Sequence, residues 1–143
     1  MTRAMPIAVL VAAAAALLPA TAMAAAPTVA VHSSRYGRIL TDGHGRTLYL
    51  FTRERGARSR CYGACANAWP PLVAHGPLAA GRGARRSLLG VTRRRDGSRQ
   101  VTYRGHPLYY YVGESRAGQI LCQNVTEFGG TWLVVSPGGA AIH

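Results

Sequence analysis

The sequence contains no lysine and few carboxylates, although its 143 residues include 17 basic side chains. All of these are therefore arginines, and only five acidic residues oppose them, which gives a formal net charge of +12. A strongly positive chain favours encounters with anionic surfaces such as lipopolysaccharide, acidic envelope polymers and extracellular nucleic acid. Composition offers a second interpretation, because a chain rich in arginine, alanine and glycine but devoid of lysine is typical of a GC-rich genome. Charge alone leaves both interpretations open.

The chain also lacks the signatures of common catalytic and cofactor sites. None of its serines lies in a Gly-x-Ser-x-Gly elbow, and Gly43-x-Gly45 belongs to a predicted hairpin turn and not to a phosphate-binding loop. In CYGACANAW three residues separate the cysteines and alanine follows the second, whereas covalent haem attachment requires two intervening residues and a following histidine. We therefore expect no enzymatic activity, no cofactor and no metal.

An apolar run near the N-terminus has the pattern of a secretory signal peptide. It extends over residues 7–18 and leads into small residues, where Ala22-Met23-Ala24 offers a cleavage site. A membrane anchor is the alternative, but the run is short for spanning a bilayer. We predict that residues 1–24 are removed and that residues 25–143 form a single domain, without a membrane span, in the periplasm or outside the cell.

Two segments of the chain share one pattern of aromatic and acidic residues. The stretch TLYLF at 47–51 returns as PLYYY at 107–111, and the same offset of sixty positions relates Glu54 to Glu114. A tryptophan follows in each segment, near an apolar run and a proline. The shared motif consists of Tyr49, Phe51, Glu54 and Trp69 in the first segment and Tyr109, Tyr111, Glu114 and Trp132 in the second. This self-similarity predicts two copies of one structural unit.

The local pattern within both copies predicts β-hairpins. GRILTDGHGRTLYLF has two runs of β-forming residues around an Asp-Gly-rich turn, and VTRRRDGSRQVTYRGHPLYYY has Asp96-Gly97 between two such runs. CYGACANAW favours a short helix, which Pro70-Pro71 ends. The predicted fold class is therefore all-β, mostly β with one short helix. Two pseudo-symmetric β-hairpin repeats, at about residues 35–73 and 89–137, form one compact domain.

These segments resemble a bacterial family of secreted or lipoprotein repeats of unknown function, which is described by a Tyr-x-aromatic-x-x-Asp motif. The resemblance rests on LTDGHGRTLYLFTRE, CYGACANAWPPL, RRDGSRQVTYRGHPLYYYVGE and FGGTWLVVSP, in the family's order. Glu54 and Glu114 stand where the family motif has aspartate. No lipidation cysteine follows the predicted cleavage site, so this member resembles a freely secreted one.

The duplicated glutamates are predicted to have a structural role. Glu54 and Glu114 lie just beyond predicted strands, where a carboxylate accepts hydrogen bonds from backbone N–H groups of the following turn. The alternative is an envelope-polymer hydrolase in which the two act as general acid and base, or a site where they bind a hard cation. Acid and base roles require environments that push two pKa values apart, whereas these two share one local context.

The repeated aromatic residues are predicted to form the core. Strand alternation places Tyr49 and Phe51 on one face of the first copy, and Tyr109 and Tyr111 on the equivalent face of the second. A groove for a sugar or peptide, lined by the same rings, is the alternative. Tyr110 falls on the opposite face, where a surface contact is expected.

The cysteines suggest a local disulfide. Cys61 and Cys65 are close in sequence and the predicted compartment is oxidising, so their pairing is favoured, with Cys122 as the odd thiol. Pairing of Cys122 with either of the others remains open. A periplasmic redox or metal-handling protein would use these cysteines, with His44 or His106 as further ligands.

The favoured function is a non-catalytic binding or structural module of the cell envelope. Its basic surface is expected to contact an anionic envelope polymer or surface, without specific recognition of nucleic acid. The arginines expected to form the contact are Arg82, Arg85, Arg86, Arg93, Arg94 and Arg95.

Overall fold

The computed structural model of the chain describes residues 1, 16–20 and 28–143. The predicted signal peptide falls largely on residues 2–15 and 21–27, and its cleavage site lies outside the described residues. Within the described ranges, no helix has the length and apolar character needed to cross a membrane.

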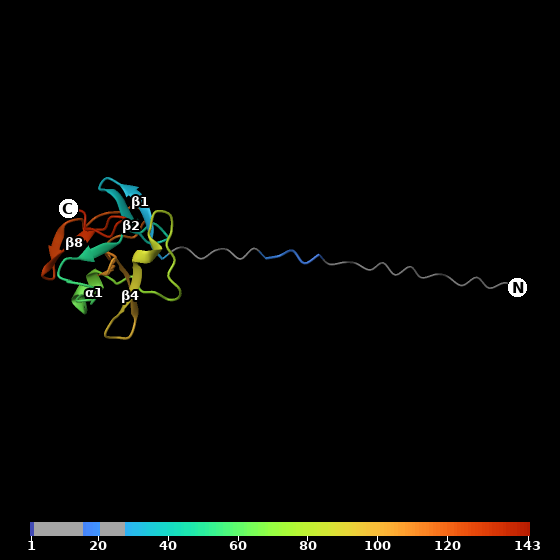
Figure 1. Ribbon diagram of the computed structural model, residues 1–143, viewed down its shortest axis with the longest axis horizontal. Helices are drawn as coiled ribbons and strands as arrows, with labels where there is room; N and C mark the ends of the chain where they lie inside the picture. Colours follow the sequence, from blue (N-terminus) through green and yellow to red (C-terminus); the bar gives the residue numbers. More distant parts are fainter. Residues whose placement is uncertain (2–15, 21–27) are drawn as a thin grey trace.

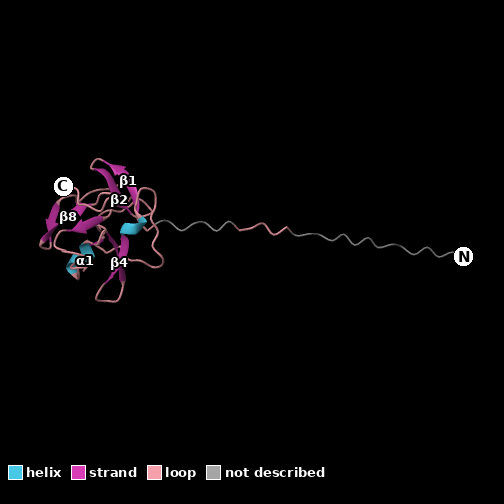
Figure 2. Ribbon diagram, viewed as in Figure 1, coloured by secondary structure: helices cyan, strands magenta, loops and turns pink. Residues whose placement is uncertain are grey.

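Short strands and turns make up the described domain (Figures 1 and 2). The strands and helices, in chain order, are β1 Ala30–Ser34, β2 Gly37–Thr41, β3 Tyr49–Phe51, α1 Ala64–Ala68, the 3-10 helix η1 Arg86–Leu88, β4 Leu89–Arg93, β5 Arg99–Tyr103, β6 His106–Pro107, β7 Val125–Glu127 and β8 Gly130–Val134. The mostly β fold with one short α-helix is therefore confirmed. The helix α1 lies within CYGACANAW, where the sequence predicts it.

The strands form three small antiparallel sheets. One contains β1 and β2, the second has the order β4-β5-β6, and the third has the order β3-β8-β7. Figure 1 shows the β1–β2 hairpin and the hairpin that begins with β4 at opposite ends of the domain. The third sheet joins the two copies, because β3 belongs to the first copy and β7 and β8 belong to the second.

The pairing within the first copy differs from the prediction. β2 pairs along its whole length with β1, and β3 pairs with β8 instead of returning against β2. The Asp42 turn does reverse the chain, because the Leu48 N–H donates to the Leu40 carbonyl at 3.2 Å. Beyond that turn, however, β3 completes a sheet with the second copy. The predicted hairpin of the second copy is confirmed by β4 and β5 around Asp96-Gly97.

Two hydrophobic clusters form the core. The first is mainly aliphatic and includes Leu40, Leu48, Leu108 and Leu133. The second holds the repeated aromatic residues together with the two cysteines of the first copy. Five of the six motif rings are buried, and Tyr111 is partly buried against the second cluster.

The centre of the second cluster is a stack of two indoles. Trp69 and Trp132 lie with ring centroids 4.0 Å apart and an interplanar angle of 2°. Each indole also packs against an aromatic ring of the other copy: Phe51 stacks on Trp132 at 4.1 Å, and Tyr111 lies 4.9 Å from Trp69. The packing therefore couples the copies through their largest side chains.

Truncation at the stack should destabilise the domain strongly. We expect Trp69→Ala to lower the free energy of unfolding by about 3–5 kcal/mol, because it removes a fully buried indole and leaves a cavity. Chemical denaturation measures this change. Val91→Ala is the control, since Val91 is 42 % exposed and its truncation should cost less than about 0.5 kcal/mol. Equal losses for the two variants would contradict a core centred on the indoles.

Candidate functional site

The two copies of the motif meet at their first tyrosines. The N–H of Tyr49 donates to the carbonyl of Tyr109 at 2.9 Å, and the N–H of Tyr109 donates to the carbonyl of Tyr49 at 3.0 Å. This reciprocal pair forms an antiparallel bridge between two segments that lie sixty residues apart. The bridge relates the two motifs by a local pseudo-twofold.

Each of these tyrosines also binds the glutamate of the other copy. The Tyr109 hydroxyl donates to Glu54 Oε2 at 2.7 Å, and the Tyr49 hydroxyl donates to Glu114 Oε1. Both carboxylates are buried, with exposed fractions of 6 % for Glu54 and 3 % for Glu114. The repeated Tyr-x-aromatic-x-x-Glu pattern therefore produces two exchanged hydrogen bonds between the copies.

The same carboxylate oxygens also hold the loops that follow them. The Arg60 N–H donates to Glu54 Oε2 at 2.6 Å, and the Leu121 N–H donates to Glu114 Oε1 at 2.9 Å. These are the contacts that a structural role predicts. The tyrosine partners were missed by sequence reasoning, because hydrogen bonds between residues so far apart leave no local signal.

Burial sets the protonation of these groups. Desolvation raises the pKa of Glu54 to about 7, although the hydrogen bonds from Tyr109 and Arg60 and the charge of Arg94 act against it. Glu54 Oε1 is buried without a hydrogen-bond partner in the described part of the chain. Burial also raises the pKa of Glu114. Both carboxyls are shifted in the same direction, whereas a general acid and a general base require opposite environments.

Glu54 should make the stability of the domain depend on pH. Between about pH 4.5 and about pH 7 the folded chain retains a proton on Glu54 that the unfolded chain has lost. The free energy of unfolding should therefore fall as pH rises through this window, by up to about 3 kcal/mol. Denaturation of the protein and of Glu54→Gln across this range measures the effect, and the variant should have the flatter profile. A residual slope is expected from Glu114, whose pKa is raised in the same direction.

Asp96→Asn provides the matched control for this experiment. Asp96 is exposed, and its hydrogen bonds with Ser98 lower its pKa, so the carboxylate stays ionised throughout the window. Asp96→Asn should keep the slope of the unmodified protein. A Glu54→Gln profile as steep as that of the control would contradict the protonation assigned to Glu54.

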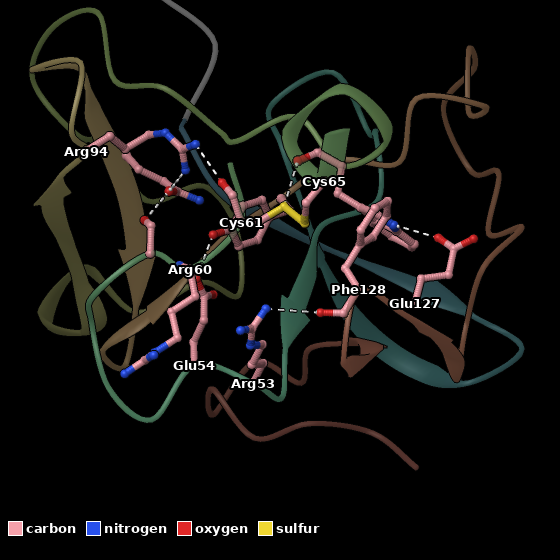
Figure 3. Close-up of a disulfide and its surroundings, with 12 residues drawn as sticks. Arg53, Glu54, Arg60, Cys61, Cys65, Arg94, Glu127 and Phe128 are labelled. Atoms are coloured by element: carbon pink, nitrogen blue, oxygen red, sulfur yellow. Dashed lines mark hydrogen bonds between the residues drawn. A yellow bond between two sulfur atoms is a disulfide. The ribbon is translucent and has the colours of Figure 1, made fainter. Parts of the chain in front are cut away.

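Figure 3 shows the disulfide of the first copy with Glu54 and Arg60 in its surroundings. Cys61 and Cys65 are bonded, with Cα atoms 5.2 Å apart, and this confirms the favoured pairing. Cys122 is a free thiol that is partly buried, and its burial raises its pKa.

Arg94 anchors the disulfide loop. Its guanidinium donates to the Cys61 carbonyl at 2.7 Å and to Gln100 Oε1 at 2.8 Å (Figure 3). Arg94 is buried, and its guanidinium is engaged by these internal partners even though the side chain borders one of the hollows described below. The prediction that Arg94 belongs to a surface patch is therefore corrected.

The other predicted arginines fall into two groups. Arg93 and Arg95 line an open hollow of about 370 Å³ together with Arg58 and Tyr62. Arg82, Arg85 and Arg86 are exposed in and before η1 but do not line this hollow.

A larger hollow of about 760 Å³ adjoins the first. The two share Tyr62 and Arg95, and the larger one also reaches Cys65 and Phe128. Arg53 and Arg60 line it as well, and Figure 3 shows the Arg53 guanidinium directed at the carbonyl of Phe128. Sequence reasoning missed Arg53, Arg58 and Arg60, although they flank Glu54 and Cys61 along the chain.

The remaining candidate residues lie apart from the arginine-lined hollows. Tyr110, predicted to make a surface contact, instead donates from its hydroxyl to Asp42 Oδ2 at 2.8 Å, and Arg46 covers its ring at 4.3 Å. His44 is exposed in the Asp42 turn and His106 is part of β6. Among the described residues, no three or more His, Cys, Asp or Glu side chains are grouped so that they would hold a metal ion.

The comparison with known families agrees with the duplication. A family model described as a secreted repeat of unknown function matches residues 30–73 and 90–136. These bounds are close to those predicted from the repeated motif, and the match covers more than half of the chain. No curated protein and no solved structure matches the chain significantly. The chain belongs to the family of secreted repeats of unknown function.

Proposed function

We propose that this protein is a non-catalytic binding or structural module of the cell envelope or of the extracellular space, and that its basic surface contacts an anionic partner. The family's description as secreted supports a location outside the cytoplasm.

The distribution of charge between the interior and the surface carries this proposal. Asp42, Glu54 and Glu114 are buried, which leaves Asp96 and Glu127 as the exposed carboxylates of the described chain. Fourteen of the sixteen arginines between residues 28 and 143 are exposed. The ratio of positive to negative side chains is therefore higher on the described surface than in the sequence as a whole. This surface should attract anionic polymers over a range of about 10 Å at moderate salt.

The contacts of the duplicated glutamates support a role without catalysis. Glu54 and Glu114 each accept from a tyrosine hydroxyl of the other copy and from a backbone N–H of their own loop, and these contacts join the copies. The exposed arginines are the most numerous charged groups on the described surface, which supports their contact with an anionic partner.

Binding to charged and uncharged polymers of one backbone tests the proposal. The domain from residue 25 onward should bind dextran sulfate at low salt and release it as salt is raised, because screening weakens contacts between exposed charges. Plain dextran is the control and should not bind. Isothermal titration or sedimentation measures both. Failure to bind dextran sulfate, polygalacturonate and DNA alike at low salt would refute the proposal.

A further inference from the structure

We propose that the protein binds an acidic glycan chain along one surface, which we call the arginine groove. The inference rests on the proposed function and assigns it a site and a ligand class. The groove consists of the two adjoining hollows, and its lining includes Arg53, Arg58, Arg60, Arg93, Arg95, Tyr62 and Phe128.

The two hollows of the groove adjoin, and the charged side chains that line them are of one sign. The hollows share Tyr62 and Arg95, so a ligand longer than one hollow can contact both. Five of the six arginines that line it are exposed, the sixth being the buried Arg94, and no carboxylate is part of the lining of either hollow. The acidic residues next to the lining along the chain are Glu54, Asp96 and Glu127. Glu54 is buried, Asp96 accepts hydrogen bonds from Ser98, and Glu127, which is exposed, accepts the indole N–H of Trp69 at 3.0 Å.

Donors remain available on these guanidinium groups. Arg53 gives one N–H to the carbonyl of Phe128, and Arg93 gives one to the carbonyl of Gly97. A guanidinium carries five N–H donors, so each retains the paired donors that match a carboxylate or phosphate. These two backbone contacts hold the side chains in place without neutralising them.

The groove is supported from below by buried groups. Arg94 binds the Cys61 carbonyl, and its guanidinium lies 4.3 Å from the centre of the Tyr62 ring. The disulfide closes the same loop through Cys65, which lines the larger hollow. The position of Tyr62 is therefore fixed by contacts of a buried arginine and by the disulfide that closes its loop.

Phe128 supplies an exposed aromatic face at a conformational cost. It occupies the two-residue turn between β7 and β8, where Glu127 pairs with Gly130 and the φ angle of Phe128 is 56°. Left-handed backbone is unfavourable for a bulky side chain, and asparagine, aspartate or glycine normally fills this turn position. Phe128 is nevertheless 40 % exposed, so core packing does not account for its presence. Strained residues of this kind cluster at binding sites.

The available ring faces favour a glycan over nucleic acid. Single-stranded nucleic acid is held by bases stacked on successive free aromatic rings. Here the guanidinium groups of Arg94 and Arg95 both lie over Tyr62, each 4.3 Å from its centre, so that ring is already occupied. Phe128 instead offers a free ring among several arginines. This arrangement suits an acidic glycan, whose sugar ring can pack on Phe128 while its carboxylates bind the arginines.

Two triple variants of equal charge locate the binding surface. Arg53→Gln/Arg60→Gln/Arg95→Gln removes three charges from the groove, and Arg82→Gln/Arg85→Gln/Arg86→Gln removes three exposed charges elsewhere. The probe is a polygalacturonate oligosaccharide, measured by titration calorimetry against neutral dextran and against an oligothymidylate of equal charge. We expect the groove variant to weaken binding of the oligosaccharide by about tenfold or more and the other variant by less than about threefold.

Phe128→Asn separates binding from folding. Asparagine tolerates the left-handed turn, so this variant should have a higher Tm than the unmodified protein and yet bind the oligosaccharide several-fold more weakly. A merely structural phenylalanine would not give opposite changes in the two measurements. A variant with unchanged affinity would overturn the assignment of Phe128.

The possible failures are distinguishable. If the unmodified protein binds no anionic probe, the proposed function itself fails. If it binds polygalacturonate but both triple variants lose affinity equally, binding is diffuse and only the groove is overturned. Tighter binding of the oligothymidylate than of the oligosaccharide would overturn the ligand class.

Discussion

The exchange of hydrogen bonds between two tyrosines and two buried glutamates is the constraint on which the rest of the structure depends. A buried carboxylate is unfavourable unless its oxygens find donors. Here the donors come from the other copy, Tyr109 for Glu54 and Tyr49 for Glu114, and from each glutamate's own following loop. Neither copy therefore satisfies its glutamate alone. The sheet that joins β3 to β8 and the stacked indoles then bury the junction.

This internal use of carboxylates shapes the surface. With Glu54, Glu114 and Asp42 buried, few negative charges remain to pair with the exposed arginines. The positive surface is thus partly a consequence of folding, whatever the origin of the arginine-rich composition. Arg94 differs from the exposed arginines, since it is buried and its guanidinium donates to the carbonyl of Cys61 in the disulfide loop.

The sequence predicts the parts of the fold that local patterns and repetition encode. Repeated motif residues reveal the two copies, alternating strand residues reveal the β class, and Cys61 and Cys65 reveal the disulfide. The exchange between copies leaves no such pattern, because Glu54 and Tyr109 are 55 positions apart. The same reason explains the misplaced pairing of β3, whose partner β8 belongs to the other copy. The location of the arginines was only partly predicted, since sequence clustering does not show that Arg94 points inward.

The residues that join the two copies are different from the residues that line the arginine groove. The tyrosines, glutamates and tryptophans of the motif occur in both copies, and their contacts join the copies. The arginine groove is not built from the repeated motif residues, since its parts come from the Arg53–Tyr62 segment of the first copy and from the β4–β5 and β7–β8 turns of the second. It therefore exists only where the two copies are assembled. The repeated residues therefore stabilise the domain, whereas the proposed binding surface uses residues outside the repeated motif.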